Sequence, residues 1–240
     1  MKINWNYIKG FFLIALTVFL VGFAHHRNIG QKVKDVTILF EEGDNLFMDY
    51  EMVNKLLIQN GKAVKNEAKS VIDLHKLEAN VLSHPMVEDA SVFLTVDGLL
   101  KTKIKQRTPI ARVLSKGSSY YIDKQAKVMP LSPNYSARVV VVSGNVNEKN
   151  IEKIYRLITA ILDDDFLSKQ IIDVEVKHKD EFVLNTRIGE QRIILGNIED
   201  LNEKFKNLKS FYNKSLNDKT IENYTTLNLK FKNQVVCTKK

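Results

Sequence analysis

The residue types that could carry out catalysis or hold a cofactor are scattered along this sequence. No HExxH, GxSxG or SxxK motif occurs. The closest glycines, Gly189 and Gly196, are seven residues apart, so neither a GxGxxG motif nor a P-loop can be built. The histidines are not paired at metal-ligand spacing: His25, His26, His75, His84 and His178. The sequence therefore predicts no enzyme, no cofactor and no metal site.

Two charged clusters could still bind ions or phosphates. Residues 163–165 are three consecutive aspartates, but they lack the alternating ligands and the glycine of a calcium loop, and a solvated turn is expected. Lys101, Lys103, Lys105 and Arg107 alternate on one face of a predicted strand. No aromatic residue interleaves them, and lysine commonly protects sheet edges. We therefore expect a solvated sheet edge there and no nucleic-acid partner.

Composition is that of an ordinary globular chain. The 240 residues are 44% hydrophobic and 27% charged, with a formal net charge of +8. Much of the positive charge lies in residues 203–240, which contain nine lysines and three acidic residues. Cys237 is the only cysteine, which excludes an intramolecular disulfide and a CxxC pair.

The N-terminal segment determines the compartment. Residues 11–24 read FFLIALTVFLVGFA, and residues 10–26 carry no formal charge. With the residues before it, this run gives about 20 helical residues, enough to cross a bilayer. We expect a short cytoplasmic tail over residues 1–9 and a transmembrane helix with its interface over residues 10–30. A cleavable signal peptide is the alternative, and in both cases the remainder is exported.

Residues 31–112 predict a first exported domain with the order β-α-α-β-β. Residues 34–40 alternate as a strand, and Asp49 and Asp73 can each cap a helix, the second ending before Pro85. A hairpin then turns at residues 97–98. Its inward-facing residues are Ala90, Val92, Leu94 and Val96 on one strand and Leu100, Thr102 and Ile104 on the other. The two helices are expected to cover this apolar face.

Residues 113–231 predict a second, mixed α/β domain with an antiparallel sheet. Hairpins are expected within residues 120–131 and 181–195, and a buried strand over residues 138–142. Ile172, Val174 and Val176 alternate as a further strand. Apolar stripes predict helices over residues 151–162 and 198–212. A final strand covers residues 224–231, and residues 232–240 form a basic tail.

These segments, in this order, resemble the FtsQ/DivIB family of bacterial cell-division proteins. The likeness includes a POTRA-like stretch over residues 34–107, with LEANVLSHPMVEDASV at 77–92, followed by TPIARV (108–113) and YYIDKQAKVMPL (120–131). It continues through VVVVSG (139–144), residues 181–212 and YTTLNLKFKNQVV (224–236). One departure is Ala126, which replaces the usual glycine of the YIDxxGxV turn. The resemblance implies an α+β fold with a single transmembrane helix, a POTRA domain and an FtsQ-type β domain.

The resemblance also implies a function. It implies a non-catalytic, single-pass scaffold of the division machinery, in the inner membrane at the septum, with its C-terminal domains in the periplasm. Its partners would be FtsB and FtsL and, through them, the septal peptidoglycan synthases; self-association stays open. A POTRA-bearing component of protein transport or outer-membrane assembly, and a secreted enzyme, are the alternatives.

The last predicted strand is the expected partner-binding edge. Because no later apolar segment is evident to pair with it, one row of its backbone groups would remain free for a partner strand. Three apolar residues are expected on its inner face and three polar residues on its outer face. The candidate site residues are Tyr224, Thr226, Leu227, Asn228, Leu229, Lys230 and Phe231. The resemblance implies that FtsB adds a strand here, whereas a closed structural strand with a disordered tail is the alternative.

Overall fold

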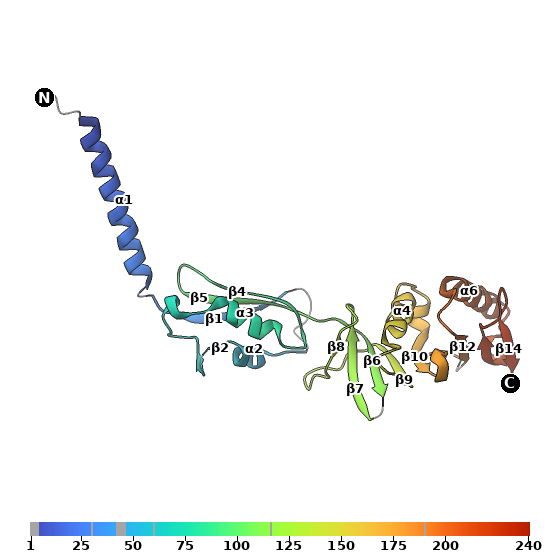
Figure 1. The fold of residues 1–240 in the computed structure, drawn as a ribbon. Helices are drawn as coiled ribbons and strands as arrows, with labels where there is room; N and C mark the ends of the chain where they lie inside the picture. Colours follow the sequence, from blue (N-terminus) through green and yellow to red (C-terminus); the bar gives the residue numbers. More distant parts are fainter. Residues whose placement is uncertain (1–4, 30, 42–46, 60, 116, 190) are drawn as a thin grey trace. The chain divides into compact units, whose positions relative to one another are not determined.

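The computed structural model divides the chain into two compact units. It describes residues 5–29, 31–41, 47–59, 61–115, 117–189 and 191–240 (Figure 1). Unit 1 is Met1–Gln106 and unit 2 is Arg107–Lys240. The boundary therefore lies a few residues before the one expected after residue 112, because residues 109–115 form a strand of the second sheet.

Helix α1 (Trp5–Ile29) begins unit 1. Its stretch Ile8–His26, 19 residues, is long and apolar enough to cross a membrane, and none of it is buried within the protein. A helix that leaves this much apolar surface uncovered fits a membrane anchor. The mixture of helices and strands and this N-terminal apolar helix agree with the coarse part of the expected fold class, a mixed α and β fold with one N-terminal apolar helix.

The remainder of unit 1 follows the order strand, two helices, two strands. The main elements are β1 (Asp35–Phe40), α2 (Tyr50–Leu56), α3 (Leu74–Leu82), β4 (Val87–Leu94) and β5 (Leu99–Gln106). A small hairpin, β2 (Ile58–Gln59) and β3 (Lys62–Ala63), and the 3-10 turn η1 (Lys69–Val71) lie between the helices. The three-stranded sheet has the order β1-β5-β4, with β1 parallel and β4 antiparallel to β5.

Local signals fix these helices as expected. The Asp49 side chain accepts the N–H of Met52 at 2.8 Å, and the Asp73 side chain accepts the N–H of Lys76 at 3.0 Å. Both contacts satisfy backbone donors that the first helical turn leaves unpaired. The two predicted caps are therefore confirmed.

Two expectations for the β4–β5 hairpin are wrong. Val96 is 89% exposed because β4 ends at Leu94 and the turn takes three residues, 96–98, with Gly98 at a φ of +95°. The lysines of β5 do not mark a sheet edge, since β5 is the central strand. Arg107 is separated from them and belongs to unit 2, where it pairs with Asp123 at 2.7 Å.

Unit 2 is built on a nine-stranded mixed sheet. Its strands are β6 (Pro109–Ser115), β7 (Ser118–Asp123), β8 (Val128–Met129), β9 (Val140–Gly144), β10 (Ile171–Val176), β11 (Phe182–Thr186), β12 (Arg192–Gly196), β13 (Tyr224–Asn228) and β14 (Val236–Lys239). The order is β14-β13-β12-β11-β10-β9-β6-β7-β8. The sequence predicts an antiparallel sheet, and this prediction is wrong in part. The pairs β6–β9, β9–β10 and β12–β13 are parallel.

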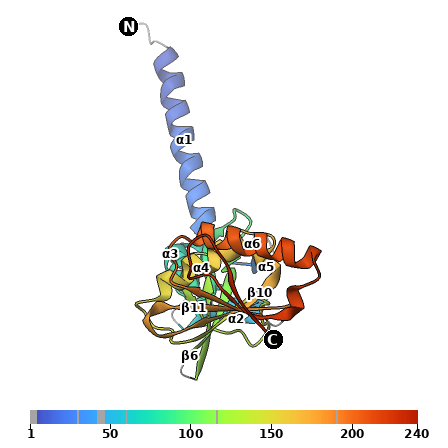
Figure 2. The same cartoon turned by 90° about the vertical axis from the view of Figure 1, so that its right-hand side faces the viewer.

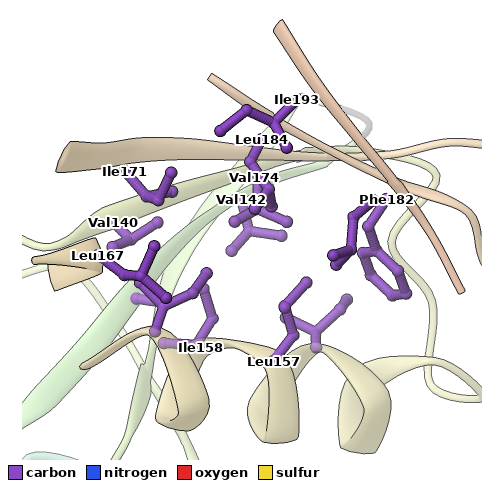
Figure 3. Close-up of a cluster of buried hydrophobic side chains, with 14 of the residues drawn as sticks. Val140, Val142, Leu157, Ile158, Leu167, Ile171, Val174, Phe182, Leu184 and Ile193 are labelled. Carbon is purple, nitrogen blue, oxygen red and sulfur yellow. The ribbon is translucent and has the colours of Figure 1, made fainter. Parts of the chain in front are cut away.

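The helices of unit 2 provide its core. They are α4 (Ile151–Leu162), the short α5 (Leu167–Gln170) and α6 (Leu201–Asn217), with the turns η2 (His178–Asp180) and η3 (Ile221–Asn223). Both views place α4 and α6 on the same side of the sheet (Figures 1 and 2). Leu157 and Ile158 of α4 point at buried valines and isoleucines of the strands (Figure 3). Helices that cross over one sheet face are the usual link between parallel neighbours.

Two local departures in unit 2 have identifiable causes. Ile172 is exposed and Ile171 is buried in its place, because the β10–β11 register shifts between Ile171 and Asp173. Ala126 has a φ of +61°, so the β7–β8 turn keeps a left-handed residue although alanine replaces the glycine that the resemblance implies.

Candidate partner-binding edge

Strand β13 carries the first four of the predicted site residues and the other three follow its end, but β13 is not the edge of the sheet. One of its sides pairs in parallel with β12, and its other side pairs in antiparallel with β14. Leu227, for example, lies opposite Ile193 on one side and Cys237 on the other. The prediction of an open edge at residues 224–231 is therefore wrong, since both rows of the strand's backbone groups face a neighbour.

The segment that covers β13 was expected to be a basic tail. Residues 235–237 are Val-Val-Cys, short apolar residues between polar and basic ones, and a four-residue strand is too brief to show an alternating pattern. Asn233 adopts a φ of +57° in the loop between the two strands, which asparagine tolerates. Among the described strands, β14 is the one that ends the sheet on this side.

Of the three residues predicted on the inner face of the last strand, the first two are buried and the third is not. Leu227 is fully buried and Leu229 almost so, and the N–H of Leu229 donates to the carbonyl of Ile194 at 2.9 Å. Phe231 is 48% exposed, because the strand ends at Asn228 and the chain has already turned. Thr226 and Asn228 are half-buried, as residues on the opposite face of a paired strand.

The lysines after β13 differ in their surroundings. Lys230 pairs with Glu181 at 2.6 Å, and this contact is more than one third exposed. Lys232 is exposed. A partly screened surface pair contributes little to stability, so Lys230 can exchange Glu181 for another carboxylate at low cost.

Helix α6 and its neighbours hold this end of the sheet in place. Tyr212 is buried, its hydroxyl donates to the Gln191 side chain at 3.3 Å, and burial raises its pKa. Phe211 packs edge-on against Tyr224 of β13, with ring centroids 5.4 Å apart. Cys237 packs against the core from β14, and burial raises the pKa of its thiol. A raised thiol pKa makes the reactive thiolate scarcer, as in a structural cysteine.

The titratable groups of unit 2 with shifted pKa values lie on different elements. Burial raises the pKa of Asp173 on β10, against the hydrogen bonds it accepts from Asn185 and Ser143. Burial lowers the pKa of Lys204 on α6. Asp164, from the predicted acidic turn, accepts from Lys209 and from two backbone N–H groups, and these contacts lower its pKa. Its carboxylate thus caps a turn, as expected of a structural aspartate.

These groups lie apart from one another, on β10, on α6 and in the turn after α4. Within the described ranges, no cluster of three or more His, Cys, Asp or Glu side chains could hold a metal ion. What distinguishes this end of unit 2 is its backbone: a short terminal strand whose inner side is paired and whose outer side ends the sheet. In other proteins, an extended peptide can add to an exposed sheet edge through main-chain hydrogen bonds.

Comparison with known proteins identifies the family. A family model described as FtsQ/DivIB, C-terminal related, matches residues 108–238, which is more than half of the chain and nearly all of unit 2. No curated protein matches the chain. The match includes the strands from β6 to β13 and most of β14. The chain therefore belongs to the FtsQ/DivIB family.

Proposed function

We propose that this chain is a non-catalytic, single-pass membrane scaffold of the bacterial division machinery. The observation that carries the proposal is the family match over residues 108–238, in a chain that begins with one apolar helix of spanning length. The part of unit 1 that follows α1 would be the POTRA domain of the family, and this part and unit 2 would lie in the periplasm. The scaffold would act at the division septum of the inner membrane.

Depletion and complementation test this role. Cells depleted of the chain should grow as filaments without septa, and the full chain should restore division. A variant in which a cleavable signal peptide replaces residues 1–30 is still exported but is no longer anchored in the membrane. It therefore tests whether the anchor itself is needed for division. If that soluble version restores division fully, the anchored-scaffold proposal fails. Detection of a mature N-terminus near His25 in the native protein would also contradict it.

We place the partner contact at β14 instead of β13. FtsB and FtsL of the same organism are the proposed partners, and an extended segment of FtsB would add to the outer side of β14. Thr238 and Lys239 are exposed there, and Lys230 and Lys232 lie in the preceding loop. These lysines favour acidic residues in the added segment. The septal peptidoglycan synthases would be reached only through FtsB and FtsL.

Photo-crosslinking at the two ends of the same sheet tests this placement. A photoreactive residue at Thr238 in β14 should crosslink FtsB in cells. The matched control is Val128 in β8, which is also exposed but ends the sheet on its other side. Equal crosslinking at both positions, or crosslinking at 128 alone, would refute the β14 edge while leaving the scaffold role untouched.

The alternative of a transport or outer-membrane assembly component rests only on the expected POTRA domain. The family match lies in unit 2 and points to division instead. Crosslinking of Thr238 to an outer-membrane assembly protein, with normal septation after depletion, would reverse this preference.

A further inference from the structure

The turn at residues 95–98 carries the most exposed large apolar side chain in the described part of the protein. Val96 is 89% exposed, more than any apolar residue described in α1. Folding of unit 1 therefore leaves this side chain uncovered. An apolar side chain exposed at the tip of a turn can contact a membrane or another protein.

This turn is fastened to the segment that follows α1. The Lys69 ammonium donates to the Gln31 side chain at 2.7 Å and to the carbonyls of Thr95 and Val96 at 3.2 and 2.5 Å. The N–H of Lys34 donates to the carbonyl of Gly98 at 2.8 Å. The position of the turn is therefore fixed relative to residues 31–34.

The fastening keeps the turn within reach of the bilayer that α1 would span. Gln31 lies five residues beyond His26, the end of the apolar stretch. Five residues extend at most roughly 18 Å, and less when they are partly helical. Headgroup layers of a bilayer add several ångströms on each side of the apolar core. If α1 spans the membrane, this short chain length and the hydrogen bonds to residues 31–34 together hold the turn near the lipid interface.

Positive charge gathers around Val96. Lys32 and Lys34 are exposed, and Lys101 is half-exposed on β5 just after the turn. The pKa of Asp97 is lowered chiefly by its hydrogen bonds to Thr95 and to its own backbone. The positive charges of Lys34 and Lys101 lower it further, which agrees with both lysines lying close to the turn. The lysines at this end of unit 1 outnumber the carboxylates: Lys32, Lys34, Lys65, Lys69 and Lys101 against Asp35, Glu67 and Asp97.

We propose that the turn at residues 95–98, with Lys32, Lys34 and Lys101, is a membrane-contact site for anionic lipid headgroups, with Val96 in the interfacial layer. The inference rests on the proposed function only in requiring that α1 spans the membrane. An apolar tip surrounded by lysines combines the two attractions that hold peripheral segments at anionic membranes. Each lysine near such a surface contributes about a fivefold factor in partitioning. The contact would orient unit 1 on the bilayer without a protein partner.

Spin labels on the full chain in nanodiscs test this site. With Cys237→Ser as background, a label at Val96→Cys should be shielded from a nickel chelate and reached by oxygen when phosphatidylglycerol is present. In phosphatidylcholine alone, or in high salt, the shielding should weaken several-fold. The control label is Leu82→Cys, at another exposed position. Leu82 precedes the start of β4 by five residues, whereas the turn follows the end of β4, so the two labels lie at opposite ends of this strand. The control label should stay water-accessible in both lipids.

Charge reversal and an anchor control separate the outcomes. Lys32→Glu with Lys34→Glu should abolish the lipid dependence at position 96. A label at Leu16→Cys reports whether α1 is inserted. If position 16 is in lipid and position 96 remains as water-accessible as position 82, or responds equally to both lipids, the headgroup site is refuted and the anchor stands. If position 16 is itself in water, the anchor proposal fails.

Discussion

The two units treat the ends of their sheets differently. In unit 1, the outer side of β4 is covered by side chains: Glu78 of α3 accepts the N–H of Val92 at 3.0 Å, and Asp89 accepts the N–H of Ala90 at 2.9 Å. In unit 2, the sheet ends in a short strand, β14, with an exposed Thr238. Capped backbone donors cannot recruit a strand, whereas an uncapped edge can. Of the two strands compared, β14 is therefore the better candidate for pairing with another chain.

The units also differ in their ion pairs. Unit 1 places its pairs at the surface, as in Lys65–Asp35, whose side chains are both more than half exposed. Unit 2 buries Arg107–Asp123, with side-chain exposures of 11% and 2%. Asp123 also accepts the N–H groups of Gln125 and Lys127. A buried carboxylate with three donors fixes a turn far more strictly than a solvated pair does.

The largest expected effect comes from breaking the core of unit 1 alone. Val92→Asp places a charge at a buried position of β4, which should cost several kcal/mol and unfold this unit. Hydrogen exchange of the full chain should then show loss of protection over residues 35–106 and little change over residues 107–240. The control is Phe93→Asp on the open face of the same strand, which should leave protection intact. Loss of protection in both units would contradict independent folding.

Removal of the buried carboxylate should have the next largest effect. Asp123→Ala removes the carboxylate partner of Arg107 and leaves two backbone donors without their acceptor, and we expect a loss of about 3 kcal/mol from the free energy of unfolding of unit 2. Denaturant titration measures this loss. Asp35→Ala in unit 1 is the matched control and should have no measurable effect. A similar cost for both changes would remove the contrast between the ion pairs.

Uncapping β4 tests the comparison of sheet ends directly. Glu78→Ala frees the N–H of Val92 and should cost about 1 kcal/mol, while exposing an edge that promotes self-association. Sedimentation at increasing protein concentration measures the association. Glu78→Gln retains an acceptor and should behave as the wild type. If the alanine variant stays monomeric, the caps do not protect this edge.

The smallest effects concern one turn in each unit, and they have opposite signs. Ala126→Gly relieves a left-handed alanine in unit 2 and should stabilise it by about 0.5–1 kcal/mol. Gly98→Ala should destabilise unit 1, because the added Cβ would lie 2.9 Å from the carbonyl oxygen of Lys32 at a φ of +95°. Thermal melting of both variants measures the shifts. A lower melting temperature for Ala126→Gly would show that the turn does not strain the alanine.

The sequence predicts the parts of this fold that depend on neighbouring residues. The caps at Asp49 and Asp73, the stripes of α4 and α6, and the hairpin through Gly189 are encoded within a few positions. The parallel pairings are not, because they join residues about 30 positions apart, as in β6 with β9. A bulge moves Ile171 into the place of Ile172 for a similar non-local reason.

The candidate site shows the same limit. Leu227 and Leu229 were identified as buried because alternation is a local pattern. The covering of β13 by β14 depends on Val236 and Cys237, which are too few to produce a pattern among polar neighbours. Local alternation therefore predicts which residues of β13 are buried, but it does not predict that the sheet ends one strand further along, at β14.

The late position of β13 and β14 in the chain also sets a time order. A ribosome makes the chain from its amino end, so the strands from β6 to β12 are available to pair before α6, β13 and β14 emerge. The parallel β12–β13 pair must wait for the whole of α6, and β14 can align only on β13. The edge proposed for FtsB thus forms after the rest of this sheet. A chain in which β14 has not paired with β13 would present no such strand, so the proposed partner would select molecules whose unit 2 is folded.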